Sequence, residues 1–204
     1  LQEIFVNAKI DVQEDTMAAV RATLNHSDEA AVVCIMGTGS NCSYYDGKNL
    51  HQRVKSLGYS LMDDASGNRY GKMLIRDYYF NKMPNTIKLA FEHKYNLDAD
   101  FIKYNLYKQA NPNAYLAKFA EFMFLNKDSE YIQKVIKRGF RIFTENMIMQ
   151  YAEELKTVPV HFAGSIAYFS QNEIKEVAEE FGFKVGNFVR RPIDGLVEYH
   201  IKNL

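Results

Sequence analysis

The sequence predicts an α/β fold, in which a sheet is covered by helices on at least one face. Three observations carry this prediction. Short apolar runs typical of buried strands alternate with helical patterns near both ends of the chain. The middle of the chain, residues 84–155, has apolar side chains at helical spacing. The 204 residues, with 14 Tyr and 14 Phe, are also enough to bury a sizeable core.

The first elements expected are a strand, a helix and a second strand. Residues 4–12 are apolar enough for a short inner strand. The alanines of Met17–Leu24 favour a helix that packs closely on a sheet, and Asp15 lies at its start. A carboxylate is favoured there as an N-cap and by the helix dipole. Ala31–Met36 is a continuous apolar run, so we expect a buried strand.

A hairpin and a helix are expected next. Asp46-Gly47 is a hairpin turn signal, with residues 40–45 and 49–54 as the two arms. An irregular stretch, residues 56–67, then leads into a helix at about 68–80.

The rest of the chain is predicted to be helical and then to alternate again. Pro84 suits the first turn of a helix, and Gly182 is a helix stop. The expected strands are residues 158–163 and 183–189, and the expected helices are residues 171–181 and 193–203.

The composition excludes several classes of protein. The 25 basic and 25 acidic residues balance, which argues against non-specific nucleic-acid binding. Cys34 and Cys42 do not make a disulfide scaffold, and the five histidines lack metal-ligand spacing, so we expect no metal site built from side chains. The apolar runs are too short for a membrane span, and the N-terminus has no secretory pattern. We therefore expect a cytoplasmic protein that binds neither membrane nor nucleic acid.

Small residues and carboxylates recur where strands end and helices begin. Glycine lets backbone N–H groups approach a phosphate or a sugar closely. Taken alone, Asp15 is more often a helix cap and Gly164-Ser165 more often a turn, whereas Gly37–Ser40 is as often a plain turn as a binding loop. The features, in chain order, are Asp15, Gly37-Thr-Gly-Ser40, Asp63-Asp64-Ala-Ser66-Gly67 and Gly164-Ser165.

Four pieces that contain these features, residues 14–19, 37–41, 57–67 and 163–166, resemble one protein family. The resemblance is to the N-acetylglucosamine kinases of the BadF/BadG/BcrA/BcrD ATPase family, within the actin–hexokinase–Hsp70 superfamily. It spans nearly the whole chain, in the family's order.

The resemblance implies a two-lobed, RNase H-like fold with ATP in the cleft. Residues 1–40 would be the remainder of the N-terminal lobe, and residues 41–204 the C-terminal lobe, with a helical insertion at about 84–156. The family's first phosphate loop, an Asp-Gly-Gly-Gly-Thr-like hairpin with the Mg²⁺-associated Asp, has no counterpart in this sequence. The chain also begins at Leu1 without an initiator Met. We therefore expect an incomplete N-terminal lobe and a poor catalyst.

The resemblance also implies a catalytic residue and a phosphate loop. Asp15 would be the general base that accepts the proton of the attacking sugar hydroxyl, although Glu14 stands where the family has Asn. Gly37, Thr38 and Gly39 would contact the phosphates of ATP.

The remaining implied roles concern the sugar and the nucleotide. Gly164 and Ser165 match the adenosine-side loop. The residues implied to face the sugar are Ser40, Asn41, Gly58 and Asp63. The sequence departs from the family around Asp63, and these departures leave the identity of the sugar open. They are Leu57 for Trp, Met62 for Gly, Asp64 for Glu and Ala65 for Gly.

The predicted function is that of a kinase using ATP and Mg²⁺ to phosphorylate a hydroxyl, the 6-OH, of N-acetylglucosamine or a related amino sugar. Two alternatives stay open. One is an ATPase that activates a reductase, a branch that needs cysteines for a shared iron–sulfur cluster. The other is a non-catalytic protein that senses a sugar or a nucleotide. The oligomeric state also stays open, with a homodimer as one option.

Overall fold

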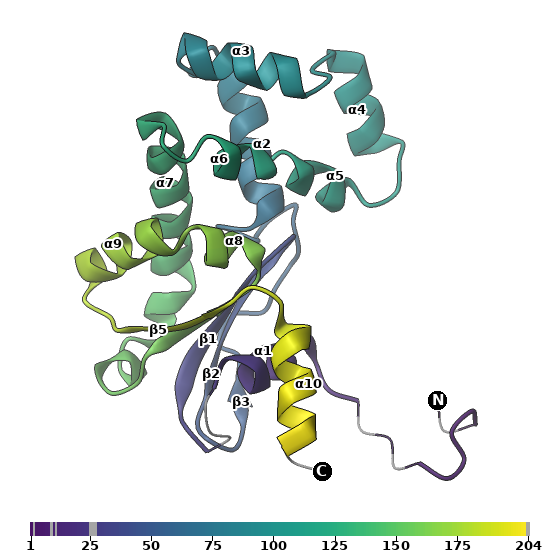
Figure 1. Cartoon of the computed structure of the whole chain (residues 1–204), viewed down its shortest axis with the longest axis vertical. Helices are drawn as coiled ribbons and strands as arrows, with labels where there is room; N and C mark the ends of the chain where they lie inside the picture. The colour runs from purple at the N-terminus through teal and green to yellow at the C-terminus, as the bar shows by residue number, and fades with distance from the viewer. Residues whose placement is uncertain (2, 9, 11, 25–27, 203–204) are drawn as a thin grey trace.

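The computed structural model describes residues 1, 3–8, 10, 12–24 and 28–202. A five-stranded sheet has helices against both faces, and a group of helices extends beyond one end of it (Figure 1). The predicted α/β class is therefore confirmed. Within the described residues, no helix is both long enough and apolar enough to span a membrane.

The sheet combines antiparallel and parallel strands in the order β3-β2-β1-β4-β5. The strands are β1 (Ala31–Met36), β2 (Ser40–Tyr45), β3 (Leu50–His51), β4 (Val160–Ala163) and β5 (Val185–Val189). The strands β1, β2 and β3 form an antiparallel meander, whereas β1, β4 and β5 run parallel to one another. Ile35 lies in register with Ala163, so the carboxyl ends of β1 and β4 share one edge of the sheet.

The helices lie close to their predicted positions. The α-helices are α1 (Asp15–Thr23), α2 (Gly67–Tyr79), α3 (Asn85–Lys94), α4 (Ala99–Tyr107), α5 (Pro112–Lys118), α6 (Glu121–Leu125), α7 (Glu130–Asn146), α8 (Ser165–Phe169), α9 (Gln171–Phe181) and α10 (Pro192–Lys202). The 3₁₀ turns are η1 (Ile148–Tyr151) and η2 (Glu154–Lys156). The stretch 84–155 is helical as predicted, and it is divided into short helices. One break is at Asn111, which has a left-handed φ of 58° before the proline that opens α5.

The two faces of the sheet bury separate cores, because alternate side chains of a strand point to opposite faces. Ala31 and Val33 of β1 pack with Ala19 and Val20 of α1 in the smaller core. The intervening residues of β1 face the larger core, to which α2, α7 and α9 contribute. The helix α10 lies beside α1 on the first face (Figure 1).

The group of helices beyond the sheet depends on one close crossing, between α2 and α5. A Cβ atom at Gly71 would lie 1.9 Å from the carbonyl oxygen of Leu116. Only glycine allows this approach, and the crossing brings α5 against α2. The rings of Phe91 and Phe122, 5.0 Å apart between centroids, are part of the aromatic packing behind it.

The strand predicted at residues 4–12 is wrong for the described residues of that segment. They form turns with local hydrogen bonds, such as Phe5 N to Leu1 O at 2.9 Å. Ile4 and Val12 are 74% and 76% exposed. A strand is stabilised by pairing with another strand, and this segment pairs with none among the described residues.

Two further expectations concern the strands of the sheet. The second hairpin arm is shorter than residues 49–54, because β3 contains only Leu50–His51. A lobe boundary at residue 40 would cut between β1 and β2, which pair along their whole lengths from Ala31–Tyr45 to Met36–Ser40. The two strands thus belong to one sheet, and the position of a boundary between lobes stays a prediction.

Candidate functional site

The loop Gly37–Ser40 leaves the carboxyl end of β1 and covers the first turn of α2. The Gly67 N–H donates to Gly37 O at 2.7 Å, and the Asn68 N–H donates to Thr38 O at 3.1 Å. The first N–H groups of a helix have no partner within the helix. The carbonyls of the glycine loop satisfy two of them here, so the loop and the start of α2 form one unit.

The carboxylate of Asp63 lies directly against this loop. A Cβ atom at Gly39 would be 3.0 Å from Asp63 Oδ2, so glycine leaves room for the carboxylate against the loop. Asn68 Nδ2 donates to Asp63 Oδ2 at 3.0 Å and to Thr38 O at 2.6 Å. The structure thus brings together Asp63 and the glycine loop, as the sequence predicts.

Asn68 is a candidate site residue that no sequence motif indicated. It is fully buried, and its Oδ1 atom has no hydrogen-bond partner among the described residues. An unpaired buried oxygen is costly unless something else binds it. The only sequence signal was the position of Asn68 at the start of a predicted helix.

The turn before α2 holds two residues with left-handed backbone. Asp63 has φ 64° and Ala65 has φ 56°. Aspartate tolerates this region, whereas alanine does not favour it. Such conformations persist only where the surroundings impose them, and they concentrate at functional sites.

Asp64 connects the same turn to three neighbouring elements through hydrogen bonds and an ion pair. The Ser40 hydroxyl donates to the Asp64 carbonyl at 2.7 Å. The Asp64 carboxylate pairs with Arg69 at 3.3 Å and accepts a hydrogen bond from Asn146 Nδ2 at 3.2 Å. Because these groups come from β2, α2 and α7, they limit the freedom of the turn that carries Asp63.

Gly164 brings the end of β4 to the same place. It has φ 113° and ψ 161°, and a Cβ atom there would lie 2.3 Å from Met36 O and 3.2 Å from Gly37 N. Ser165 follows as the exposed first residue of α8. Ligands of α/β sheets commonly bind at the carboxyl ends of parallel strands, which is where Gly37 and Gly164 meet.

Two predicted site residues are not joined to this group by any contact within the described part of the chain. Asp15 is exposed at the first position of α1, where Glu14 rather than Asp15 is the N-cap. Asn41 Oδ1 accepts from Cys42 N at 2.8 Å and from Gln52 Nε2 at 2.7 Å. Strand alternation places Asn41 on the sheet face of α1, opposite Ser40.

The loop that carries Gly58 contacts α2 through a lysine of that helix. Gly58 has φ 78°, which glycine adopts readily. Lys72 Nζ donates to Tyr59 O at 3.3 Å. Burial is the main cause that lowers the pKa of Lys72, and Arg69 adds to it, while Asp63 and others oppose it. Lys72 is therefore a second cation, after Arg69, close to the predicted sugar-binding carboxylate.

The loop geometry fits a bound phosphate. Among the described residues, no backbone carbonyl accepts a hydrogen bond from the N–H groups of Thr38 and Gly39. A Cβ atom at Gly37 would meet nothing within 4 Å, so a ligand can approach the backbone. Free N–H groups in a glycine loop form concavities that bind anions.

The described residues contain no group of three or more His, Cys, Asp or Glu side chains placed to hold a metal ion. Magnesium in nucleotide sites is held largely by phosphates and water, with one or two carboxylates. A magnesium ion held by a nucleotide would therefore not require such a group of side chains.

The two cysteines are poorly placed for a cluster shared at a surface. Cys34 and Cys42 are 0% and 1% exposed, and their sulfur atoms lie 3.4 Å apart between β1 and β2. Burial is the main cause that raises the pKa of the Cys34 thiol, which keeps it protonated. This burial argues against the reductase-activator alternative.

Comparison with known proteins finds similar solved structures, among them two crystal structures. No family model matches the chain, and no curated protein matches it. A crystal structure from Porphyromonas gingivalis, provisionally identified as an N-acetylglucosamine kinase, matches with a TM-score of 0.85 and 30% sequence identity. The match covers 93% of this chain and 65% of that one, so the chain spans about two thirds of its neighbour.

A second crystal structure, from Chromobacterium violaceum and with the same provisional identification, shares the fold at lower similarity. Its TM-score is 0.59 and its sequence identity 15%, over 90% of this chain and 62% of that one. The chain therefore has a mixed α/β, kinase-like fold.

Proposed function

We propose that this chain is part of an ATP-dependent kinase that phosphorylates the 6-OH of N-acetylglucosamine or a related amino sugar. The observation that carries the proposal is the meeting of Gly37–Gly39, Asp63 and Gly164 at one edge of the sheet. The likeness to the Porphyromonas gingivalis structure supports the same activity.

The nucleotide side of the proposed site consists of backbone groups. Thr38 and Gly39 would bind phosphate oxygens through their N–H groups, and the exposed side chain of Thr38 lies beside them. The N–H of Gly37 donates to Gly39 O at 2.9 Å, so Gly37 would contribute to the phosphate site by letting the ligand approach the backbone. Gly164 and Ser165 would pass beside the adenosine. Bound ATP with Mg²⁺ would supply the phosphoryl group.

The sugar side consists of polar side chains. Asp63 would accept hydrogen bonds from two adjacent sugar hydroxyls, because a carboxylate offers two oxygens. Ser40 would lie beside the sugar together with Asp63, because its hydroxyl donates a hydrogen bond to the carbonyl of the adjacent Asp64. The loop that carries Gly58 would approach from α2, which it contacts through Lys72. Asn41 would reach the sugar from the α1 side, the side that also carries Asp15.

Asp15 would accept the proton of the sugar hydroxyl as that oxygen becomes the nucleophile. Asp15 lies in the first turn of α1, at the positive end of the helix dipole, where an acidic side chain is common. In phosphoryl transfer, most of the catalytic effect comes from positioning and charge stabilisation.

We also propose the two-lobed, RNase H-like arrangement for the longer protein. The strand order, with β1, β4 and β5 parallel and β1 to β3 antiparallel, is compatible with one such lobe. The helices from residue 84 to 156 would be an insertion in that lobe, and the other lobe would precede β1.

The test is an ADP-release assay on the full-length protein with a panel of hexoses and hexosamines. The expected result is turnover with an N-acetylated amino sugar, lowered about 100-fold or more in the Asp15→Asn variant. Glu14→Gln is the matched control, because Glu14 is the adjacent carboxylate on the same helix cap.

Two outcomes would contradict the proposal in different ways. If Asp15→Asn lowers turnover by less than about twofold, Asp15 is not the general base. Binding of sugar and ATP without turnover on any sugar of the panel would favour a sensing protein over a kinase.

A further inference from the structure

A groove between α4 and α5 is separate from the loops that form the candidate kinase site. Its volume is about 400 Å³, within the range of small-molecule sites. Phe101, Tyr104 and Asn105 line it from α4, at the i, i+3, i+4 spacing of one helix face. Tyr115 and Lys118 line it from α5.

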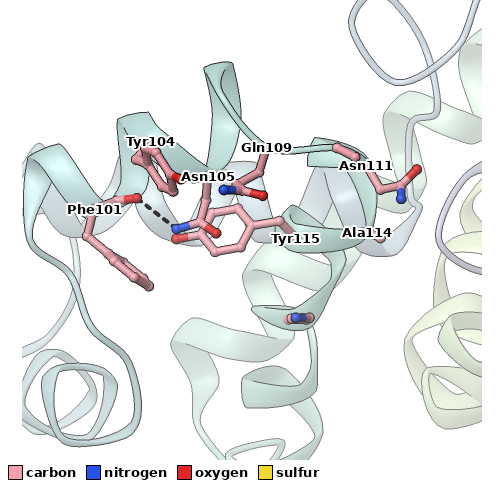
Figure 2. Close-up of a pocket in the computed structure, with 9 residues that line it drawn as sticks. Phe101, Tyr104, Asn105, Gln109, Asn111, Ala114 and Tyr115 are labelled. Atoms are coloured by element: carbon pink, nitrogen blue, oxygen red, sulfur yellow. Dashed lines mark hydrogen bonds between the residues drawn. The ribbon is translucent and has the colours of Figure 1, made fainter.

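The groove combines aromatic rings with side-chain amides. The amides of Asn105 and Gln109 lie beside the ring of Tyr115, with Phe101 near one end of the group (Figure 2). Asn105 Nδ2 donates to Phe101 O at 2.8 Å, which fixes that amide at the groove wall. Aromatic rings offer apolar faces, and amides offer both donors and acceptors.

The hydroxyl of Tyr115, a residue that lines the groove, is buried and lacks a hydrogen-bond partner among the described residues. A buried hydroxyl without a partner costs about 1–3 kcal/mol. Burial also raises the pKa of Tyr115, so the hydroxyl stays protonated and can donate.

The charges that line the groove argue against a cation as its ligand. Lys118 is the one charged side chain among the residues that line it, so it offers no carboxylate for a cation. A pyranose ring has an apolar C–H face that stacks on aromatic rings, and hydroxyls around its rim that suit amides and the Tyr115 hydroxyl. We propose that the α4–α5 groove binds a saccharide, at a site distinct from the candidate kinase site.

The position of the groove allows its residues to be changed without disturbing the fold. The α2-facing side of α5 holds Leu116 and Ala117, which contact Gly71 and Gly67. Tyr104 is 54% exposed, and Tyr107, on the same helix, is 77% exposed and does not line the groove. Tyr107→Ala is therefore a matched control for Tyr104→Ala.

The experiment is saturation-transfer difference NMR on the full chain with N-acetylglucosamine and its β-1,4-linked dimer. It is done in an Asp63→Asn background, which weakens the candidate kinase site. We expect saturation transfer to ring protons of the sugar in this background. Tyr104→Ala should raise Kd by about tenfold, whereas Tyr107→Ala should leave it unchanged.

Tyr115→Phe separates binding from folding. We expect it to weaken saccharide binding by about fivefold while leaving Tm unchanged or higher, because the unpaired hydroxyl is removed. A lower Tm with unchanged binding would make that hydroxyl structural and would overturn the proposal.

Other outcomes would overturn it as well. One is the absence of saturation transfer in the Asp63→Asn background, and another is an equal effect of Tyr104→Ala and Tyr107→Ala on Kd. A third is displacement of the bound saccharide by adenosine at a lower concentration than by the sugars. None of them bears on the kinase proposal, which depends on Asp15 and Asp63.

Discussion

The side-chain amide of Asn68 joins the glycine loop to Asp63: its Nδ2 atom is 3.0 Å from Asp63 Oδ2, and 2.6 Å from the carbonyl oxygen of Thr38. One buried nitrogen thus holds the proposed sugar-binding carboxylate in place against the proposed phosphate loop. The orientation of Asp63 should therefore depend on Asn68.

We expect Asn68→Ala to lower the free energy of unfolding by about 2 kcal/mol, because two partly buried acceptors, Thr38 O and Asp63 Oδ2, lose their donor. Urea denaturation measures this change. In the full-length kinase assay, the same variant should raise KM for the sugar more than it lowers kcat, because Asp63 becomes free to move.

Asn146→Ala is the control for Asn68→Ala. Asn146 is exposed and makes one 3.2 Å bond to Asp64, so its loss should cost less than about 1 kcal/mol. Equal effects of the two variants would show that Asn68 has no special place in the site.

Gly164 should be the glycine least tolerant of substitution at the sheet edge. Its φ of 113° and ψ of 161° lie in a region that is almost restricted to glycine, and a Cβ atom would collide with Met36 O at 2.3 Å. We expect Gly164→Ala to cost about 3 kcal/mol or more of unfolding free energy.

Gly182→Ala is the control that measures the cost of backbone strain without the steric collision expected in Gly164→Ala. Gly182 has φ 77°, and a Cβ atom there would meet nothing within 4 Å. Only the strain of about 1 kcal/mol should appear in chemical denaturation. If both alanine variants lost the same stability, close packing at Gly164 would contribute nothing.

The parts of the site that the sequence predicts are those set by local pattern. The apolar run before Gly37 predicts β1, and the small residues after it predict a tight turn, because both depend on neighbours in the chain. The role of Asn68 could not be predicted, since its partner Thr38 is 30 residues away. Strand alternation already implied that Ser40 and Asn41 would face opposite sides of the sheet.

The wrong strand at residues 4–12 has a different cause. Apolar composition predicts burial, but a strand also needs a partner edge. Ile4 and Val12 have the composition of a strand, and they are exposed because no strand of the described residues pairs with their segment.

His161 should make stability depend on pH. Burial is the main cause that lowers its pKa, with Glu29 opposing, and its Nδ1 accepts from Asn187 N at 2.9 Å. Its folded pKa lies below the ordinary value of 6.5, so the unfolded chain takes up the proton first as pH falls. The contribution of His161 to folding stability is thus fully present above pH 6.5, and it is lost as the pH falls through the pKa of the folded state.

Urea denaturation between about pH 8 and about pH 5 measures this loss. In His161→Asn, whose side-chain oxygen can accept from Asn187 N, we expect a smaller loss of stability on acidification. His93→Asn, at an exposed position in α3, should behave like the parent protein. A parent-like profile in His161→Asn would exclude this histidine as the source.

The buried cysteines allow a test of how firmly the sheet supports the proposed site. Cys34 and Cys42 face each other across β1 and β2, the strands that precede and follow the glycine loop, and are 0% and 1% exposed. Thiol reagents react with the thiolate, and burial restricts both access and, for Cys34, ionisation, through its raised pKa. We expect a reagent such as dithionitrobenzoate to modify neither thiol in the native protein.

Modification should instead follow unfolding. Both thiols should react together, at a rate that rises with urea as the global unfolding equilibrium does, because the strands carrying them are part of one core. Cys42→Ser should leave Cys34 equally protected. Rapid reaction of Cys34 in the native protein would mean that β1 and β2 separate without global unfolding. The glycine loop that joins these strands would then be too mobile to hold a phosphate in a fixed position, so the same result would count against the proposed kinase site.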